Sequence, residues 1–190
     1  MSNKGFQQSS PCGMLGWKTD AEFVGSQLKP TAFAQTGESV ISGVRYSHTN
    51  LVARDWRALA AFYESLFGCV PVPPERDYSG PQLEAGTGVA GAAVAGVHLR
   101  LPGHGQDGPT LEIYSYTPSS SALAPAVDQP GFAHVAFEVA SVQDAQRQVL
   151  AAGGSPVGEI VTLTTSAGAR VTWCYVTDPE GNIIELQSWA

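Results

Sequence analysis

Two stretches of the chain share one pattern of apolar and polar positions. In the first, residues 46–68, an alternating strand pattern is followed by apolar residues spaced three and four apart, which is typical of an amphipathic helix. The helical stripe consists of Leu59, Phe62, Tyr63, Leu66 and Phe67. Asp55 is suited to cap the start of the helix and Gly68 to end it in the left-handed conformation. The pattern predicts a strand that carries His48, followed by a capped helix.

The same unit recurs at residues 132–154, displaced by 86 positions, so that His134 corresponds to His48 (134 − 48 = 86). A strand over Phe132–Val139 precedes Ser141, another good N-cap residue. The helix that follows is expected to end at Gly153-Gly154, and its inward residues are expected to be Val142, Ala145, Val149 and Leu150. The chain therefore contains an internal duplication.

Further strands follow each repeated unit. In the first half they are expected at Cys69–Val72, Val94–Leu101 and Thr110–Tyr116, with a loop over Pro73–Gly88. In the second half they are expected at Val157–Leu163, Arg170–Thr177 and Asn182–Ser188, the last two joined by the turn Asp178–Gly181. Each half is thus predicted to be a βαβββ module, and the fold class to be α+β.

Composition suggests where the modules begin and end. All three lysines lie in the first 40 residues, and this shift marks residues 1–41 as an N-terminal extension of unknown role. The first module is expected over residues 42–117 and the second over residues 131–190. Residues 118–130, rich in serine and proline, are interpreted as a linker between them.

The overall charge narrows the function classes. A net charge of −7 argues against nucleic acid or an anionic membrane as the main partner. No apolar run approaches the roughly 20 residues that cross a bilayer, and no convincing signal peptide is present. The three cysteines, Cys12, Cys69 and Cys174, are unclustered and are interpreted as reduced apolar residues. A cytoplasmic enzyme or small-molecule binder is expected.

The duplication also repeats a pair of metal-binding residue types. Besides His48 and His134, each module has a glutamate in its last strand, Glu112 and Glu185, four residues after a turn glycine. Imidazole and carboxylate groups bind zinc, nickel, iron and manganese, and one residue from each of four strands can converge on a single cavity. The four residues are therefore predicted to be metal ligands.

Other candidates have ordinary structural interpretations beside the functional ones. His98 can face the cavity as an additional acid–base group or simply be packed, whereas His104 is interpreted as a solvated loop residue. Tyr114 and Tyr116 share the strand face of Glu112 and are candidates to line the pocket. Arg100 and Arg170 can bind an anionic substrate group, but surface roles are equally consistent with the sequence.

From about Ser42 to Trp189 the chain resembles the vicinal oxygen chelate superfamily, which includes glyoxalase I, methylmalonyl-CoA epimerase, extradiol dioxygenases and the fosfomycin- and bleomycin-resistance proteins. The resemblance rests on the segments HTNLVARDWRALAAFYESLFG, LEIYSY, GFAHVAFEV and DPEGNIIELQ. It implies two paired βαβββ modules that form a curved, cavity-bearing mixed sheet. It also implies a small-molecule substrate and a homodimer.

The ligand pattern His48, Glu112, His134 and Glu185 is similar to that of glyoxalase I. The resemblance implies a lactoylglutathione lyase-like enzyme whose divalent metal, zinc or nickel first and iron or manganese as alternatives, chelates two neighbouring substrate oxygens. An enediolate is then stabilised while a carboxylate moves a proton between adjacent carbons. Glu185 is the expected base and Glu112 the second choice.

Two departures limit this resemblance. Val52 stands nearest to the position where glyoxalase I has an arginine for glutathione, and Arg54 comes two residues later, which weighs against glutathione. Both modules lack lysine, which weighs against a fosfomycin-type site. Two alternatives stay open: a non-catalytic binder like the bleomycin-resistance proteins, and an Fe(II) extradiol dioxygenase that uses three of the four ligands and His98.

Overall fold

The structure is a computed structural model that describes residues 42–120 and 125–190. Predictions about the extension at residues 1–41, including Cys12, and about residues 121–124 of the linker lie outside the described residues. Arg45–Ala190 forms one compact unit. The module boundaries expected from the composition stay a prediction.

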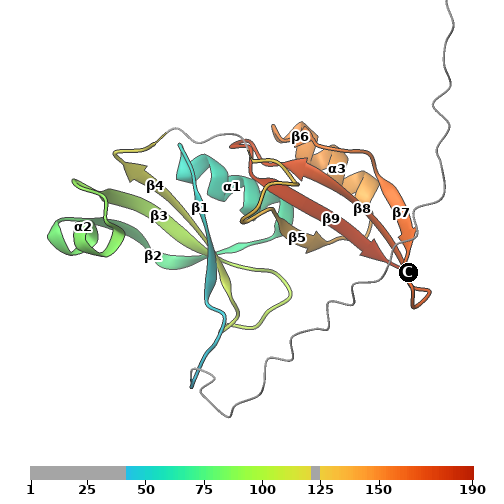
Figure 1. The fold of residues 1–190 in the computed structure, drawn as a ribbon, viewed down its shortest axis with the longest axis horizontal. Coiled ribbons are helices and arrows are strands. Elements are labelled where there is room, and N and C mark those ends of the chain that lie inside the picture. The colour runs from blue at the N-terminus through green and yellow to red at the C-terminus, as the bar shows by residue number, and fades with distance from the viewer. Residues whose placement is uncertain (1–41, 121–124) are drawn as a thin grey trace, which may run out of the picture. The chain divides into compact units, whose positions relative to one another are not determined.

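The first module is built around a four-stranded sheet with strand order β1-β4-β3-β2. Strands β1 (His48–Val52) and β4 (Thr110–Thr117) run parallel, whereas β4 pairs antiparallel with β3 (Ala93–Arg100), which pairs antiparallel with β2 (Val70–Ser79). Helix α1 (Trp56–Phe67) packs against β3 and β4, and the short helix α2 (Pro81–Thr87) follows β2 (Figure 1).

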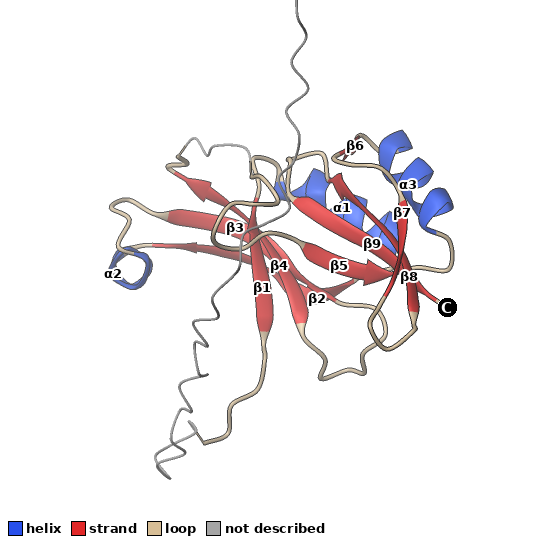
Figure 2. Cartoon of the chain, turned by 45° about the vertical axis from the view of Figure 1, so that its right-hand side comes forward, coloured by secondary structure: helices blue, strands red, loops and turns tan. Residues whose placement is uncertain are grey.

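The second module repeats this plan with strand order β5-β9-β8-β6. Strand β5 (Val135–Glu138) runs parallel to β9 (Ile183–Trp189), and β9 pairs antiparallel with β8 (Arg170–Thr177). Strands β6 (Ser155–Pro156) and β7 (Val161–Thr164) pair with successive parts of β8. Helix α3 (Val142–Ala151) lies against β8 and β9 (Figure 2). The predicted α+β class and the paired modules are confirmed, as two mixed sheets.

Helix α1 begins and ends where the sequence predicts. The Asp55 side chain accepts hydrogen bonds from the backbone N–H groups of Arg57 and Ala58, both at 3.1 Å. Gly68 has φ 66° and donates its N–H to the Glu64 carbonyl at 3.2 Å. Because these end signals are local, they fix the helix without reference to the rest of the chain.

The predicted loop over Pro73–Gly88 is wrong. Strand β2 continues to Ser79 across a register shift between Val72 and Arg76, and α2 occupies Pro81–Thr87. Pro73 and Pro74 are tolerated because β2 is an edge strand, where the missing N–H groups need no partner on the outer side. The placement of Leu150 is also wrong, since it is exposed while Val142 and Val149 are buried.

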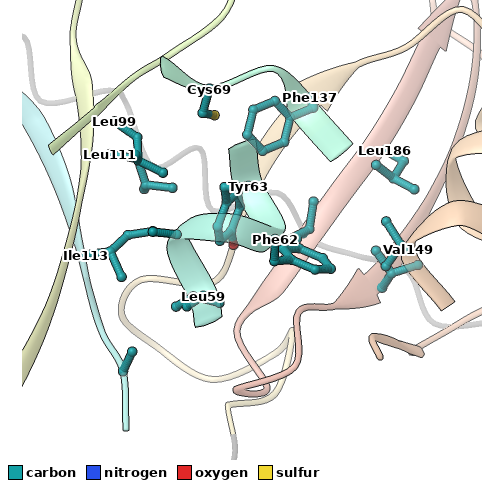
Figure 3. Close-up of a cluster of buried hydrophobic side chains, with 14 of the residues drawn as sticks. Leu59, Phe62, Tyr63, Cys69, Leu99, Leu111, Ile113, Phe137, Val149 and Leu186 are labelled. Carbon is teal, nitrogen blue, oxygen red and sulfur yellow. The ribbon is translucent and has the colours of Figure 1, made fainter. Parts of the chain in front are cut away.

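One hydrophobic core serves both modules. Figure 3 shows Phe62 and Tyr63 of α1 between Leu111 and Ile113 of the first sheet and Val149 and Leu186 of the second module. The Phe67 ring stacks on that of Phe137 with centroids 4.1 Å apart. Cys69 and Cys174 are free and buried among these residues, as expected.

Polar contacts join the modules at the β8–β9 turn. The buried Tyr63 hydroxyl donates to Asp178 Oδ2 at 3.0 Å, and the same carboxylate accepts from the backbone of Glu180 and Asn182. Glu180 in turn accepts from the backbone N–H groups of Arg54 and Asp55 at 3.0 and 3.1 Å. These hydrogen bonds therefore stabilise the turn itself and connect it to the segment that leads into α1.

Within residues 42–120 and 125–190, no helix is both long and apolar enough to span a membrane.

Candidate metal centre

Strand alternation in the first module brings two histidines and a glutamate to one face of its sheet. Leu111 and Ile113 of β4 point into the core, so Glu112 between them points to the opposite face. On β3, His98 stands directly across from Glu112, and on β1 Asn50 occupies the equivalent position. His48 lies two residues before Asn50 and therefore shares its face.

These three side chains converge; we call His48, His98 and Glu112 the first half-site. The Nε2 atom of His98 lies 2.9 Å from Glu112 Oε1, and that of His48 lies 3.5 Å from Glu112 Oε2. One donor atom from each residue lies within 4.8 Å of the other two. His98 and Glu112 are 18% and 14% exposed and His48 is 40% exposed, so the group opens to solvent on the His48 side.

Neighbouring polar groups hold the first half-site in place. The Thr110 hydroxyl lies 2.9 Å from His98 Nδ1, and Asn50 donates its Nδ2–H to Glu112 Oε2 at 2.8 Å. The Tyr114 hydroxyl lies 3.4 Å from His98 Nε2. A side chain at Gly96 would overlap the Tyr114 ring, so the glycine makes room for this tyrosine.

Electrostatics favour neutral groups around Glu112. Burial lowers the pKa of His98, against the opposite influence of the Glu112 carboxylate. Burial and the hydrogen bond to Glu112 raise the pKa of Tyr114. Burial therefore favours the neutral imidazole of His98 and the neutral phenol of Tyr114.

The second half-site, defined as His134 and Glu185, is simpler. His134 Nε2 lies 3.1 Å from Glu185 Oε2, with side chains 29% and 18% exposed. Tyr175 stands across from Glu185 on β8, and its ring centroid is 5.1 Å from that of His134. Burial and then the Glu185 charge raise the pKa of Tyr175.

The two half-sites are not equivalent, although they occupy matching positions. Tyr175 takes the place of His98, because each stands opposite its module's glutamate. Ala136 takes the place of Asn50, because each is two residues after its module's first histidine. The duplication therefore preserves the His–Glu pairs and changes their neighbours.

The structure brings together each predicted His–Glu pair but not all four predicted ligands. Among the described residues, the group with three donor atoms close enough to share one ion is His48, His98 and Glu112. His98, for which the sequence left open an acid–base role or simple packing, thus belongs to the cluster. The sequence contains a signal for it, since His98 and Glu112 are each seven residues from Gly105 in the turn that joins their strands.

A cavity of about 620 Å³ adjoins the second half-site. It is within the range usual for small-molecule sites. His134 lines it together with Tyr46, Leu101, Phe132 and Glu138. A smaller cavity of about 190 Å³, lined in part by Thr49, Leu51 and His134, lies between β1 and β5.

The structure also places the other tyrosine, histidine and arginine candidates of the sequence analysis. Tyr114 contacts the first half-site, whereas Tyr116 lies two residues farther along, opposite Val94. His104 is exposed, as expected, and Arg170 is exposed at the start of β8. Arg54 is the arginine nearest to the position expected for a glutathione-binding arginine. Its Nε–H donates to Glu180 Oε2 at 2.6 Å.

The family model described as the Glyoxalase/Bleomycin resistance protein/Dioxygenase superfamily matches residues 45–186. No curated protein matches the chain.

Among solved structures, a glyoxalase family protein from Bacillus cereus aligns with a TM-score of 0.67 and 20% identity, covering 80% of this chain and 98% of that one. A glyoxylase/bleomycin resistance protein/dioxygenase domain from Frankia aligns with a TM-score of 0.48 and 18% identity, covering 79% and 93%. A fosfomycin resistance protein from Listeria monocytogenes, complexed with Mn(II) and sulfate, aligns with a TM-score of 0.41 and 15% identity, covering 78% of this chain and 93% of that one. The Bacillus cereus structure supports the fold.

Proposed function

Because the chain belongs to the glyoxalase/bleomycin resistance protein/dioxygenase superfamily, we propose that it is a metal-dependent lyase or isomerase that acts on a small substrate with adjacent oxygens. The observation that carries the proposal is the pair of matched His–Glu contacts, His48 with Glu112 and His134 with Glu185. A merely structural histidine has no reason to recur beside a glutamate at the same point of both modules.

The donor set fits a divalent metal. Imidazole nitrogens and carboxylate oxygens suit zinc, nickel, iron and manganese, and the described residues around Glu112 supply both donor types. His48 and Glu112 would hold the ion from the first module, and His134 and Glu185 would face it from the second. When bound, the metal would polarise two neighbouring substrate oxygens and so favour loss of a proton from the adjacent carbon.

Glu185 is the residue proposed to move that proton. Glu112 has both carboxylate oxygens engaged, Oε1 with His98 and Oε2 with Asn50. Glu185 contacts His134 through Oε2 and hydrogen-bonds the Tyr175 side chain, and Ala136 stands where Asn50 holds Glu112. The less restrained carboxylate is better able to take a proton from one carbon and return it to the next, while His134 orients it.

The two half-sites are proposed to meet between two copies of the chain. Within the described residues of one chain, His134 and Glu185 do not join the group formed by His48, His98 and Glu112. Mixing a His48→Gln/Glu112→Gln chain with a His134→Gln/Glu185→Gln chain tests this arrangement. Random pairing of two inactive chains would restore about a quarter of the wild-type activity if sites lie between copies, and none if each site lies within one chain.

Glutathione is not part of the proposal. Val52 has no group for a carboxylate, and the Arg54 guanidinium is already bonded to Glu180. The proposed substrate is therefore a small hydroxyketone or ketoaldehyde with two neighbouring oxygens.

The test combines metal analysis with proton exchange. Purified protein should contain bound zinc, nickel, iron or manganese, and should catalyse deuterium uptake from D₂O into dihydroxyacetone or a related hydroxyketone, followed by NMR. Glu185→Gln should lower the exchange rate by roughly 10²–10⁴-fold, the usual contribution of a general base. Glu159→Gln, at an exposed position, is the matched control. Protein without metal and without exchange would instead support a non-catalytic binder.

A second candidate, an Fe(II) dioxygenase, is favoured by one observation. Two histidines and one carboxylate, the composition of the first half-site, are typical of non-haem iron oxygenases. Oxygen uptake with catechol by the iron-loaded protein would favour the dioxygenase. Deuterium exchange without oxygen uptake would favour the lyase or isomerase.

A further inference from the structure

We propose that His98 is a metal ligand, so that His48, His98 and Glu112 bind the metal within the first module and the second module supplies only the proton-transfer groups. This inference rests on the proposed metal dependence but departs from a ligand set shared equally by both modules. It assigns to His98 a role that the symmetry of the duplication does not suggest.

The geometry of the three donors supports the assignment. His98 Nε2 is 2.9 Å from Glu112 Oε1, which is closer than His48 Nε2 is to Glu112 Oε2, at 3.5 Å. The imidazole rings of His48 and His98 pack in a T-shaped arrangement, with centroids 5.5 Å apart. Two nitrogens and a carboxylate oxygen that all lie within 4.8 Å of one another can bind a single cation with little movement.

The surroundings of His98 favour ligation through Nε2. Metal-binding histidines usually donate their other ring N–H to a neighbouring acceptor, which fixes the tautomer and the ring orientation. The Thr110 hydroxyl, 2.9 Å from His98 Nδ1, is positioned to accept that bond. The lone pair of Nε2 is then directed toward Glu112 and His48. Thr110 is a positioning residue in this arrangement.

The second module lacks these features. Tyr175 replaces His98 opposite the glutamate, so the second module offers no second imidazole at this position. Ala136 replaces Asn50, so Glu185 lacks the amide that holds the second oxygen of Glu112. Three protein ligands in the first module would also leave coordination positions for two substrate oxygens.

Metal titration of the apo-protein separates the two ligand sets. Zinc affinity is measured by competition with a chromophoric chelator for the wild type, His98→Gln and His134→Gln/Glu185→Gln. His98→Gln should weaken zinc binding by about 100-fold or more, whereas the double variant should stay within about tenfold of the wild type. His104→Gln, an exposed histidine of the same chain, is the matched control, and circular dichroism checks the fold.

The opposite pattern would overturn the inference while leaving metal dependence intact: unchanged zinc affinity in His98→Gln with loss of zinc in the double variant. A wild type that binds no divalent metal would overturn both proposals.

A second measurement needs no variant of uncertain folding. The complete chain has only four histidines, so nitrogen NMR of the wild type can follow each imidazole during zinc titration. The Nε2 signals of His48 and His98 should move together to metal-bound positions while that of His104 stays. A His98 Nε2 signal that keeps its free position when zinc saturates the protein would show that His98 only orients Glu112.

Discussion

At the scale of single residues, the first half-site depends on how His98 and Glu112 are held. Thr110 fixes one ring nitrogen of His98, and Asn50 fixes one oxygen of Glu112. Side chains that orient ligands matter for metal binding nearly as much as the ligands themselves. The Thr110 hydroxyl is therefore expected to affect metal binding, although it is not expected to touch substrate.

Replacing Thr110 by valine tests this point with almost no change in shape. Thr110→Val should weaken zinc binding by about 10–100-fold, because His98 loses the partner of its Nδ1. Thr162→Val is the control, since Thr162 pairs with Thr172 at an exposed position. Equal zinc affinities for the two variants in the chelator competition would argue against the orienting role.

Tyr63 gives a prediction for the pH dependence of stability. Burial raises the pKa of Tyr63 well above its ordinary value of 10.0, with the Asp178 charge adding to the effect. The folded state therefore keeps a proton that the unfolded state loses above pH 10. The stability from this group is present below pH 10 and is lost as pH rises beyond it.

Urea unfolding between pH 8 and 11 measures this effect. The free energy of unfolding of the wild type should fall above pH 10, and it should fall less steeply in Tyr63→Phe. The other buried tyrosine of the first module, Tyr114, contributes in the same direction, so the slope is reduced and not abolished. Identical slopes for the two proteins would contradict the assignment.

The sequence predicted the strand positions of the four candidate ligands but not how their side chains group, and their role as metal ligands stays a prediction. His48, His134, Glu112 and Glu185 were recognisable because strand alternation and the repeat place them without any knowledge of the tertiary structure. The cluster with His98 depends on the register across the β3–β4 hairpin. The equal spacing of His98 and Glu112 from Gly105 permits this pairing but does not distinguish a ligand from a packed histidine, so the contact required the structure.

At the scale of elements, both long helices are defined by their caps. Asp55 caps α1, and Ser141 caps α3 by accepting from the Asp144 N–H at 3.2 Å. These ends were predicted to the residue because capping is a local interaction. Strand β2 was missed for the opposite reason: its prolines indicate a loop, and only its place at the sheet edge makes a strand possible.

The α1 cap leads to a stability prediction. Asp55→Ala should lower the free energy of unfolding by about 0.5–2 kcal/mol, because two backbone N–H groups lose their acceptor. Asp55→Asn should retain most of that stability, since an amide oxygen can accept the same bonds. Denaturant unfolding of the three proteins measures both values; a loss in the asparagine variant equal to that in the alanine variant would point to charge and not capping.

At the scale of the whole compact unit, residues 45–190, the modules are joined by a shared core and by the Asp178–Gly181 turn. Tyr63 reaches Asp178, and Glu180 accepts from the backbone of Arg54 and Asp55. The sequence correctly assigns this segment to a turn, but its contact with the first module is a long-range feature. The turn therefore links the two modules that carry the half-sites.

Glu180→Ala tests this connection. It should lower the free energy of unfolding by about 1–3 kcal/mol, because the hydrogen bonds of the Glu180 carboxylate to two backbone N–H groups are lost. The zinc affinity of the folded protein should stay unchanged, because Glu180 belongs to neither half-site. Glu159→Ala is the control for removal of an exposed carboxylate. A loss of zinc affinity in Glu180→Ala without a loss of stability would assign the turn a different role.

A divalent metal bound by His48, His98 and Glu112 can be located directly in crystals grown with zinc. An anomalous difference map recorded at the zinc absorption edge should show one strong peak in bonding contact with both imidazoles and the carboxylate of the first half-site. A map without a peak there, or with a peak bound by His134 and Glu185 and not by His98, would rule out this metal site.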